Sequence, residues 1–524
     1  MKFLNSVLAL GVATTIAACS ESGASTAETR TAPPALSTDQ RNSTWYRDAQ
    51  SRLQQASQRQ IDNTPGAAKN IILFVGDGMG ISTVTAARIL AGQQQGRTGE
   101  EYQLSFEQMP FAGLIKTYNT NQQTSDSAGT ASALMTGVKT KAGVLNVDET
   151  VARGDCKAGL EHPLTTALDL AELHGKRTGI ISTARITHAT PASTYAKVPE
   201  RGWEYQAPEG CRDIAAQLVE MDRGDGIDVI LGGGRRAFIP QSVTDLEGEK
   251  GKRTDGRNLV QEWKNRYGAA ATYIEDEKGF KAVDAAKTDK LLGLFQPSHM
   301  RYESDRENDK AGEPSLSEMT AKGLELVQKG EDGYFMLVEG GRIDHGHHAG
   351  NAYNALTDAV EFAKAVQVAM DNTSTEDTLI IVTADHSHAF TMAGYPTRGN
   401  PILGKVIGND EHGAPQDAPQ LAADGKPYTT LGYANGAGFA DLGDETNSDA
   451  RRDAPAHSGR VDLTEIDTTK PGFYQESLVP TGSETHGGED VGIWARGPGS
   501  HLLTGTNEQN YVFHVMVRSG GLLD

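Results

Sequence analysis

The sequence predicts an α/β fold with a central, mostly parallel β-sheet flanked by helices. Continuous apolar runs at residues 70–75, 334–338 and 378–383 are typical of strands buried on both faces. Polar turns follow these runs, and helical spacing of apolar residues follows the second one, at 352–366. Strands that alternate with helices form parallel sheets, whose ligand sites lie at the carboxyl ends of the strands.

Length and charge limit the possible functions. The chain has 524 residues, enough for one large domain with insertions. Its formal net charge is -20, which argues against a nucleic-acid partner, because phosphate backbones are bound by patches of Lys and Arg. A small anionic substrate is still compatible with this charge, since metal ions and one Arg can reverse the field inside a pocket.

The first 18 residues are typical of a secretory leader, because Lys2 precedes an apolar run. The run ends Ile-Ala-Ala before Cys19, which resembles a bacterial lipobox and implies cleavage before Cys19 and lipidation of its thiol. An ordinary signal peptide cut nearby is the alternative. Residues 19–42, rich in Ser, Thr, Ala and Pro, are expected to be a flexible tether to a domain at 43–524. We expect a protein of the bacterial cell envelope, in the periplasm or at the surface, whose only membrane contact is its lipid.

The same patterns predict the remaining elements in order. Further strands are expected at 112–118, 177–182 and 228–231. Helices are expected at 44–61, 82–92, 125–135, 164–174, 212–221, 258–266, 316–329 and 348–370. From about residue 394 to 484, Gly, Pro, Asp and Asn dominate, which indicates an insertion between two core elements. The core is expected to resume with a strand at 490–494 and a closing helix at 509–518.

The segment 339–348 gathers side chains that can bind a metal ion or a proton. They are Glu339, Asp344, His345, His347 and His348. Asp344 and His348 are four residues apart, so they would face the same way if a helix begins there. The alternative is a polar turn between strand and helix that carries a few capping groups.

Similar side chains follow other strands. Asp77 lies between glycines directly after the run at 70–75, and Asp385 and His386 follow the run at 378–383. His486 stands in a loop that leads into the strand expected at 490–494. Each could be a turn or capping residue, but four such clusters together favour metal binding. Oxygen and nitrogen ligands without Cys suit zinc and a harder ion such as magnesium.

Ser127 is the candidate nucleophile. It stands at a junction between loop and helix, where backbone N–H groups favour an anion. A plain helix cap, supplied by Asp126 or Ser127, is the alternative. If Cys19 is lipidated, Cys156 and Cys211 remain, and an even pair in an oxidising compartment suggests one disulfide, with two unrelated thiols as the alternative.

Together these motifs resemble the alkaline phosphatase family from Lys69 to about Arg518. The matching segments are residues 70–80, 83–90, 338–348, 382–388 and 485–490. The resemblance is closer to the animal type than to the enteric bacterial type. It implies an enzyme that hydrolyses phosphate monoesters through a phosphoserine at Ser127, with an alkaline pH optimum.

The resemblance also implies a role for each site residue. One zinc ion would be held by Asp344, His348 and His486. A second zinc ion would be held by Asp77, Asp385 and His386, and would activate Ser127. One magnesium ion would be held by Asp77, Thr190 and Glu339, with His188 reaching it through water. Arg201 would clamp two phosphate oxygens, because its planar fork matches them.

The departures from the enteric bacterial pattern fit the animal type. His188 and His345 stand near the magnesium site, where enteric bacterial members carry Asp and Lys. Animal members also hold calcium, but Gln296 stands here where an acid is expected, in a region that includes Glu313, which argues against calcium. The insertion resembles the animal crown region, the helix at 44–61 resembles one at a homodimer interface, and Cys156 and Cys211 match an animal disulfide.

Three alternative functions come from other classes. A phosphodiesterase or nucleotide pyrophosphatase of the same superfamily usually carries Thr as its nucleophile and spaces its ligands differently. A sulfatase needs a Cys/Ser-x-Pro-x-Arg motif, which residues 127–131 do not match. A non-catalytic phosphate-binding lipoprotein is disfavoured, because every nucleophile and ligand position carries a competent residue.

Overall fold

The computed structural model describes Arg47, residues 63–450 and residues 459–523. The chain divides into two units, residues 1–60 and 61–524, and the second unit is compact. Several predictions fall outside the described residues: the leader, the tether, Cys19 and, except for Arg47, the helix at 44–61. No helix in the described ranges is long and apolar enough to cross a membrane.

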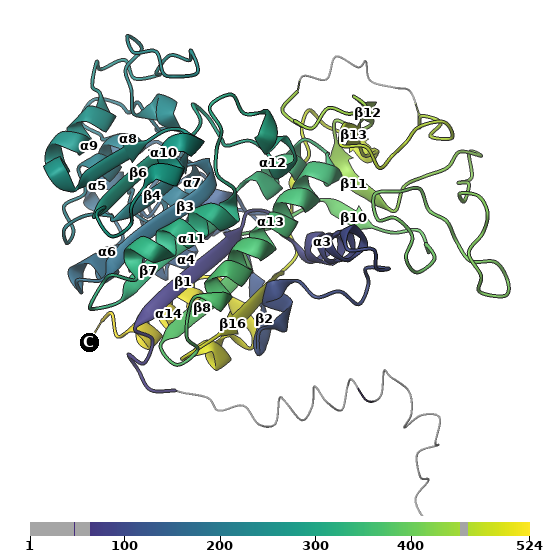
Figure 1. Cartoon of the computed structure of the whole chain (residues 1–524), viewed down its shortest axis with the longest axis horizontal. Helices are drawn as coiled ribbons and strands as arrows, with labels where there is room; N and C mark the ends of the chain where they lie inside the picture. Colours follow the sequence, from purple (N-terminus) through teal and green to yellow (C-terminus); the bar gives the residue numbers. More distant parts are fainter. Residues whose placement is uncertain (1–46, 48–62, 451–458, 524) are drawn as a thin grey trace, which may run out of the picture. The chain divides into compact units, whose positions relative to one another are not determined.

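A ten-stranded sheet forms the centre of the second unit (Figure 1). In spatial order its strands are β17 (Gly505–Glu508), β2 (Phe111–Lys116), β16 (Val491–Arg496), β8 (Thr378–Ala384), β1 (Asn70–Gly76), β7 (Tyr334–Gly340), β3 (Arg177–Arg185), β4 (Val229–Gly233), β6 (Lys290–Leu294) and β5 (Ala271–Ile274). Only β16 runs antiparallel to its neighbours in this sheet. The predicted α/β class with a mostly parallel sheet is confirmed.

Strands β1, β7 and β8 lie side by side and are buried along their whole length. Their register pairs Val75 of β1 with Glu339 of β7, and Gly76 with Ala384 of β8. Since parallel strands in register end at the same edge, the residues that follow them meet there. This register brings Asp77, Glu339 and Asp385 together although they are far apart in the sequence.

Helices cover both faces of the sheet. They are α3 (Ile81–Gln94), α4 (Ser127–Thr136), α5 (Cys156–Glu161), α6 (Ala167–Leu173), α7 (Ala189–Ala192), α8 (Ile214–Val219), α9 (Leu259–Tyr267), α10 (Glu277–Ala282), α11 (Leu316–Val327), α12 (Arg342–His348), α13 (Ala352–Asp371) and α14 (Tyr511–Gly520). Helices α11 and α13 pack together in front of β3 and β7 in Figure 1, while α4, α6 and α14 pack together behind the sheet.

One predicted helix has a different start. The helix expected at 348–370 begins at Ala352, and the ligand-rich segment before it forms the separate helix α12. Gly350 separates the two helices, because its φ of 73° is left-handed and cannot continue α12. Asn351 then caps α13 by accepting a hydrogen bond from the backbone of Asn354. Strands β5, β6 and β17 were not predicted.

Short strands organise the predicted insertion and its borders. β10 (Phe390–Met392), β11 (Leu431–Gly436) and β14 (Ser477–Pro480) form a three-stranded sheet, and β12 (Ala440–Asp441) pairs with β13 (Phe473–Tyr474). β9 (Ser387–His388) pairs with β15 (His486–Gly487), with His388 opposite His486. The end of the predicted insertion therefore returns to the carboxyl edge of the central sheet.

Candidate metal centre

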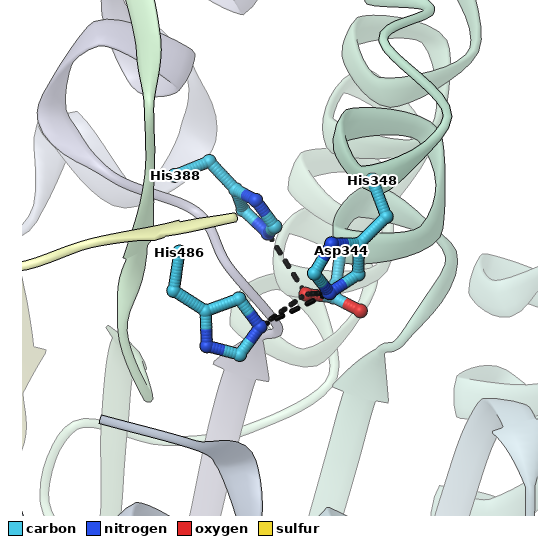
Figure 2. A group of neighbouring side chains, drawn as sticks. All are labelled: Asp344, His348, His388 and His486. Atoms are coloured by element: carbon cyan, nitrogen blue, oxygen red, sulfur yellow. Dashed lines mark hydrogen bonds and ion pairs between the residues drawn. The ribbon is translucent and has the colours of Figure 1, made fainter. Parts of the chain in front are cut away.

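The first group of converging ligand atoms contains Asp344, His348, His388 and His486 (Figure 2). Asp344 and His348 lie one turn apart on α12, with His348 Nε2 3.4 Å from Asp344 Oδ1. His486 Nε2 lies 3.5 Å from the same oxygen and 3.0 Å from His348 Nε2. Two imidazole nitrogens and a carboxylate oxygen that converge in this way match the ligand set of a zinc ion.

The second group contains Asp77, Asp344 and His386, with Asp385 beside them. His386 Nε2 lies 3.3 Å from Asp77 Oδ1 and 3.3 Å from Asp385 Oδ2. Both oxygens of Asp77 and Oδ2 of Asp385 are buried and find no hydrogen-bond partner in the described part of the chain. Buried carboxylate oxygens without partners are costly, so these residues fit a bound cation.

The third group contains Asp77, His188 and Glu339. Ser182 donates a hydrogen bond to Oε2 of Glu339, which leaves Oε1 buried and without a hydrogen-bond partner among the described residues. The hydroxyl of Thr190, in α7, is likewise buried and unpaired within those ranges. An oxygen-rich set with one nearby imidazole suits a hard ion such as magnesium.

Burial raises the pKa of three carboxylates of the centre. Burial raises the pKa of Glu339 to about 8 and that of Asp385 to about 6. Burial, reinforced by the charges of Asp344, Asp385 and Glu339, also holds the pKa of Asp77 well above its ordinary value. These buried acids repel one another, so bound cations would be needed to keep them all ionised.

The pKa values of two imidazoles of the centre are shifted in opposite directions. Burial, with the positive form of His486 nearby, holds the pKa of His386 well below its ordinary value, which keeps a nitrogen free for a metal. Burial also favours the neutral form of His388, but Glu484 and Asp344 outweigh it and raise its pKa to about 10. The surroundings of His388 therefore favour its charged form, whereas those of His386 favour the neutral form.

Ser127 lies at the start of α4 and is 2% exposed. Asp126 caps this helix by accepting a hydrogen bond from the backbone N–H of Gly129, at 3.1 Å. The Ser127 hydroxyl oxygen lies 3.0 Å from Nε2 of His386. The helix cap is therefore Asp126, and Ser127 is directed towards the second ligand group.

Arg201 is fixed beside this serine. Its Nη1 donates to Oδ2 of Asp126 at 3.1 Å, and its Nη2 lies 3.1 Å from Nε2 of His188. The backbone N–H of Gly143 also donates to Oδ2 of Asp126, at 2.9 Å. Asp126 thus links the helix that carries the candidate nucleophile to the guanidinium group expected to bind phosphate.

Three residues of this region were not predicted as site residues. His388 stands two positions after His386 in the same motif, so the motif itself was the signal that could have found it. Glu484, which contacts His388, and His299 are single residues in irregular segments and gave no signal. The His299 ring lies 4.0 Å from the ring of His345 and 5.3 Å from that of His188, between centroids.

The region expected to lack calcium contains buried acids. Gln296 donates its amide hydrogen to Oδ1 of Asp309, while Oδ2 of Asp309 and Oε2 of Glu313 have no hydrogen-bond partner among the described residues. In each of the three groups above, three ligand atoms lie within 4.8 Å of one another. The described acids of this region form no such group. The structure thus adds no support for calcium, and the expectation stays a prediction.

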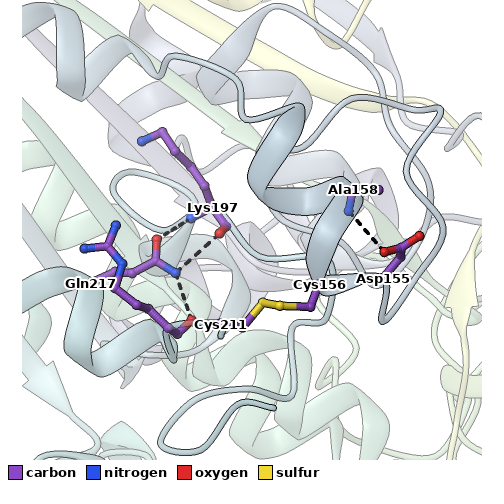
Figure 3. Close-up of a disulfide and its surroundings, with 7 residues drawn as sticks. Asp155, Cys156, Ala158, Lys197, Cys211 and Gln217 are labelled. Carbon is purple, nitrogen blue, oxygen red and sulfur yellow. Dashed lines mark hydrogen bonds between the residues drawn. A yellow bond between two sulfur atoms is a disulfide. The ribbon is translucent and has the colours of Figure 1, made fainter. Parts of the chain in front are cut away.

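Cys156 and Cys211 form the predicted disulfide, with their Cα atoms 5.9 Å apart (Figure 3). It joins the start of α5 to the loop before α8. In the same region Lys197 donates its backbone N–H to Oε1 of Gln217 at 2.9 Å. These links tie down the segment that leads to Arg201.

Comparison with known proteins identifies the family. Residues 68–522 match the alkaline phosphatase family. The chain belongs to this family. It is 45% identical over 487 residues to the tissue-nonspecific alkaline phosphatase isozyme of Gallus gallus, over 90% of this chain and 88% of the relative. The predicted resemblance to the animal type is confirmed.

Solved structures show the same fold. The alkaline phosphatase of Thermus thermophilus aligns with a TM-score of 0.62 at 24% identity, over 89% of this chain and 95% of that one. A mutant of the TAB5 alkaline phosphatase, with Mg bound in the M3 site, aligns with a TM-score of 0.58 at 23% identity, over 88% and 99%. Membership of the family makes this chain a metal-dependent phosphomonoesterase and does not favour the diesterase alternative.

Proposed function

We propose that this chain hydrolyses phosphate monoesters through a phosphoserine on Ser127, with an optimum at alkaline pH. One observation carries the proposal: Ser127 Oγ lies 3.0 Å from His386 Nε2, inside the carboxylate and imidazole groups at the sheet edge. A serine hydroxyl is a weak nucleophile at its ordinary pKa, so it needs an activating group close by. The ligand groups around Ser127 are suited to supply one.

The protein's own residues would perform most of the positioning. Ser127 Oγ gives up its proton and attacks the phosphorus, the P–O bond to the alcohol breaks, and the alcohol leaves and takes up a proton. The Arg201 guanidinium holds two of the non-bridging oxygens while Asp126 keeps it in place. The backbone N–H groups at the start of α4 favour the negative charge. Bound zinc ions would lower the pKa of the attacking hydroxyl and stabilise charge on the attacking and leaving oxygens. Water then hydrolyses the phosphoserine and releases phosphate.

The proposed metal set is two zinc ions and one magnesium ion. The first zinc site is Asp344, His348 and His486, and the second is Asp77, Asp385 and His386. The magnesium site is Asp77, Thr190 and Glu339, with His188 acting through water. The unpaired buried oxygens of the second and third groups support this assignment, as does the magnesium in the TAB5 mutant.

We also propose that the protein is a homodimer held at the bacterial envelope by a lipid on Cys19. Exposed apolar side chains in the small sheet at the insertion and its border support a homodimer. Met392 of β10 is 37% exposed, Leu478 and Val479 of β14 are 83% and 52% exposed, and Tyr395, shortly after β10, is 94% exposed. Such side chains on the outer strands of one sheet are typical of a contact surface. The anchor rests on the leader and its lipobox.

Hydrolysis of p-nitrophenyl phosphate and bis-p-nitrophenyl phosphate at alkaline pH tests the function. We expect monoester turnover well above diester turnover, abolished by a chelator and restored by zinc with magnesium. The reverse preference would assign the chain to the diesterases of the superfamily. If the protein turned over neither ester with metal bound, the hypothesis of a non-catalytic phosphate-binding protein would be favoured.

A further inference from the structure

We infer that Glu484 is a positioning residue for the first zinc site, which it orders through His388 and through its own backbone. The inference rests on the proposed zinc site at Asp344, His348 and His486. It assigns a role to a carboxylate that has no place among the proposed ligands and does not contact the substrate.

The side chain of Glu484 reaches Asp344 through one imidazole ring. Oε2 of Glu484 lies 2.6 Å from Nδ1 of His388, and Nε2 of His388 lies 2.8 Å from Oδ1 of Asp344. Each of the three residues is at most 3% exposed. Since both ring nitrogens of His388 are in hydrogen bonds, the ring is suited to hold Asp344 in place rather than to bind the metal (Figure 2).

The second oxygen of Glu484 anchors the strand that carries His388. Oε1 accepts a hydrogen bond from the backbone N–H of Ala389 at 2.7 Å. Gly78 leaves the room that His388 needs, because a Cβ at Gly78 would come within 2.2 Å of His388 Nε2. The position of the His388 ring is thus set by Glu484 on one side and by the backbone of the turn after β1 on the other.

The backbone of Glu484 holds a second ligand. Its carbonyl oxygen lies 2.7 Å from Nδ1 of His348 and accepts a hydrogen bond from it, which leaves Nε2 of His348 free for a metal. Its N–H donates to the carbonyl oxygen of His348 at 3.2 Å. The third ligand, His486, follows two residues later. One residue therefore contacts His348, reaches Asp344 through His388 and closely precedes His486.

The loop that carries Glu484 is held in turn by β11 of the predicted insertion. Thr485 donates its backbone N–H to Oδ1 of Asn435 at 3.0 Å, and Nδ2 of Asn435 donates to the Thr485 hydroxyl at 2.8 Å. Thr481 donates its N–H to the carbonyl oxygen of Gly436 at 2.9 Å. The insertion thus contributes to the metal site by fixing the loop from which Glu484 and His486 project.

Zinc affinity tests this role directly. For Glu484→Ala we expect zinc at the first site to bind about 10–100-fold more weakly, measured by competition with a chelator, because contacts of this kind contribute that much. Glu484→Gln should restore most of the affinity. Its Oε1 can accept from Ala389 N–H. Without the negative charge of Glu484, His388 can be neutral, so Nε2 of the glutamine can donate to Nδ1 while the His388 Nε2–H still donates to Asp344. The absorption spectrum of the cobalt-substituted protein should change in Glu484→Ala and stay unchanged in Glu484→Gln.

The matched control is Glu361→Ala. Glu361 is also buried and accepts hydrogen bonds from the backbone N–H and the hydroxyl of Ser317, but it belongs to none of the groups of converging ligand atoms among the described residues. We expect this variant to lose thermal stability and to keep the zinc affinity of the unmodified protein. Equal losses of zinc affinity in the two alanine variants would contradict a specific role for Glu484.

A second variant covers the case in which Glu484→Ala does not fold. His388→Phe keeps a ring of similar size and removes both hydrogen bonds. It should therefore lower the zinc affinity of the first site to the same extent as Glu484→Ala. In the double variant the losses should not add, because Glu484 acts on Asp344 through His388. Unchanged zinc affinity in Glu484→Ala or His388→Phe would overturn the inference, whereas an unmodified protein that binds no zinc would instead overturn the proposed function.

Discussion

Ser127 and His386 lie 259 residues apart in the sequence, yet the hydroxyl oxygen of the serine is 3.0 Å from Nε2 of the histidine. His386 follows β8 and Ser127 begins α4, so the sheet edge and a helix start meet at this point. The contact joins the candidate nucleophile to one of the proposed zinc sites. Activation of Ser127 at that site therefore depends on this close approach of the two side chains.

Substitution of Arg201 tests the phosphate clamp. We expect Arg201→Lys to lower kcat/KM by about 10–100-fold, or about 1.4–2.7 kcal/mol, because a lysine cannot contact Asp126 and two phosphate oxygens at once. Inhibition by inorganic phosphate should weaken in parallel. The control is Arg212→Lys, an exposed partner of Glu220, whose kinetics should match the unmodified enzyme. Unchanged phosphate inhibition in Arg201→Lys would exclude the clamp.

Removal of metal should make the stability of the fold depend on pH. Burial raises the pKa of Glu339 to about 8 and of Asp385 to about 6, from 4.5 and 3.8. The unfolded chain loses these protons at lower pH than the folded chain, so these two carboxyls should contribute less to the free energy of unfolding of the chelated protein as pH rises from about 4 to about 8. Metal ions oppose this trend, because they bind the deprotonated ligands.

Thermal melts in chelator at several pH values measure this dependence. Relative to Glu339→Gln, the Tm of the chelated unmodified protein should fall as pH rises, because the amide does not ionise. With zinc and magnesium present, this difference between the two proteins should disappear. Identical pH slopes for the chelated unmodified protein and Glu339→Gln would show that this carboxyl does not titrate as its burial implies.

Loss of the disulfide should affect stability more than catalysis. It closes a loop of 55 residues, and replacing both cysteines by alanine should cost about 2–4 kcal/mol in the free energy of unfolding. Neither cysteine contacts a proposed ligand, so kcat at 25 °C should change little. Denaturant unfolding followed by activity assays checks both points. A large fall in kcat in a folded double variant would mean that the link is needed to position Arg201.

Replacement of Cys19 tests the anchor separately from the chemistry. Cys19→Ser should release the protein from membranes into the soluble fraction with its specific activity unchanged. Fractionation of cells that express either form provides the measurement. Activity that stays in the membrane fraction after the substitution would rule out lipidation of Cys19 as the anchor.

The sequence predicted the features that depend on local pattern. The runs at β1, β7 and β8 are continuous and apolar, so both the strands and the polar residues that follow them could be placed. Asp344 and His348 were expected to face the same way if a helix begins there, and α12 provides that helix. The ligands gather at one edge because parallel strands in register end together.

The features that the sequence did not predict depend on contacts between distant segments. Strands β9 and β15 contain two residues each, too few for a pattern, yet their pairing puts His388 opposite His486. Nothing in the sequence around Glu484 distinguishes it from other acidic residues in loops, because its role depends on its spatial neighbours. The break between α12 and α13 requires Gly350 to adopt a left-handed conformation, which no apolar periodicity shows.

Trapping the covalent intermediate tests the central claim most directly. The enzyme would be mixed with a phosphate monoester, quenched in acid and digested, and the peptide that contains Ser127 would be analysed by mass spectrometry. We expect one added phosphoryl group on Ser127, absent from Ser127→Ala and from the chelated enzyme. Full monoester turnover without phosphate on Ser127, or retained turnover in Ser127→Ala, would contradict it.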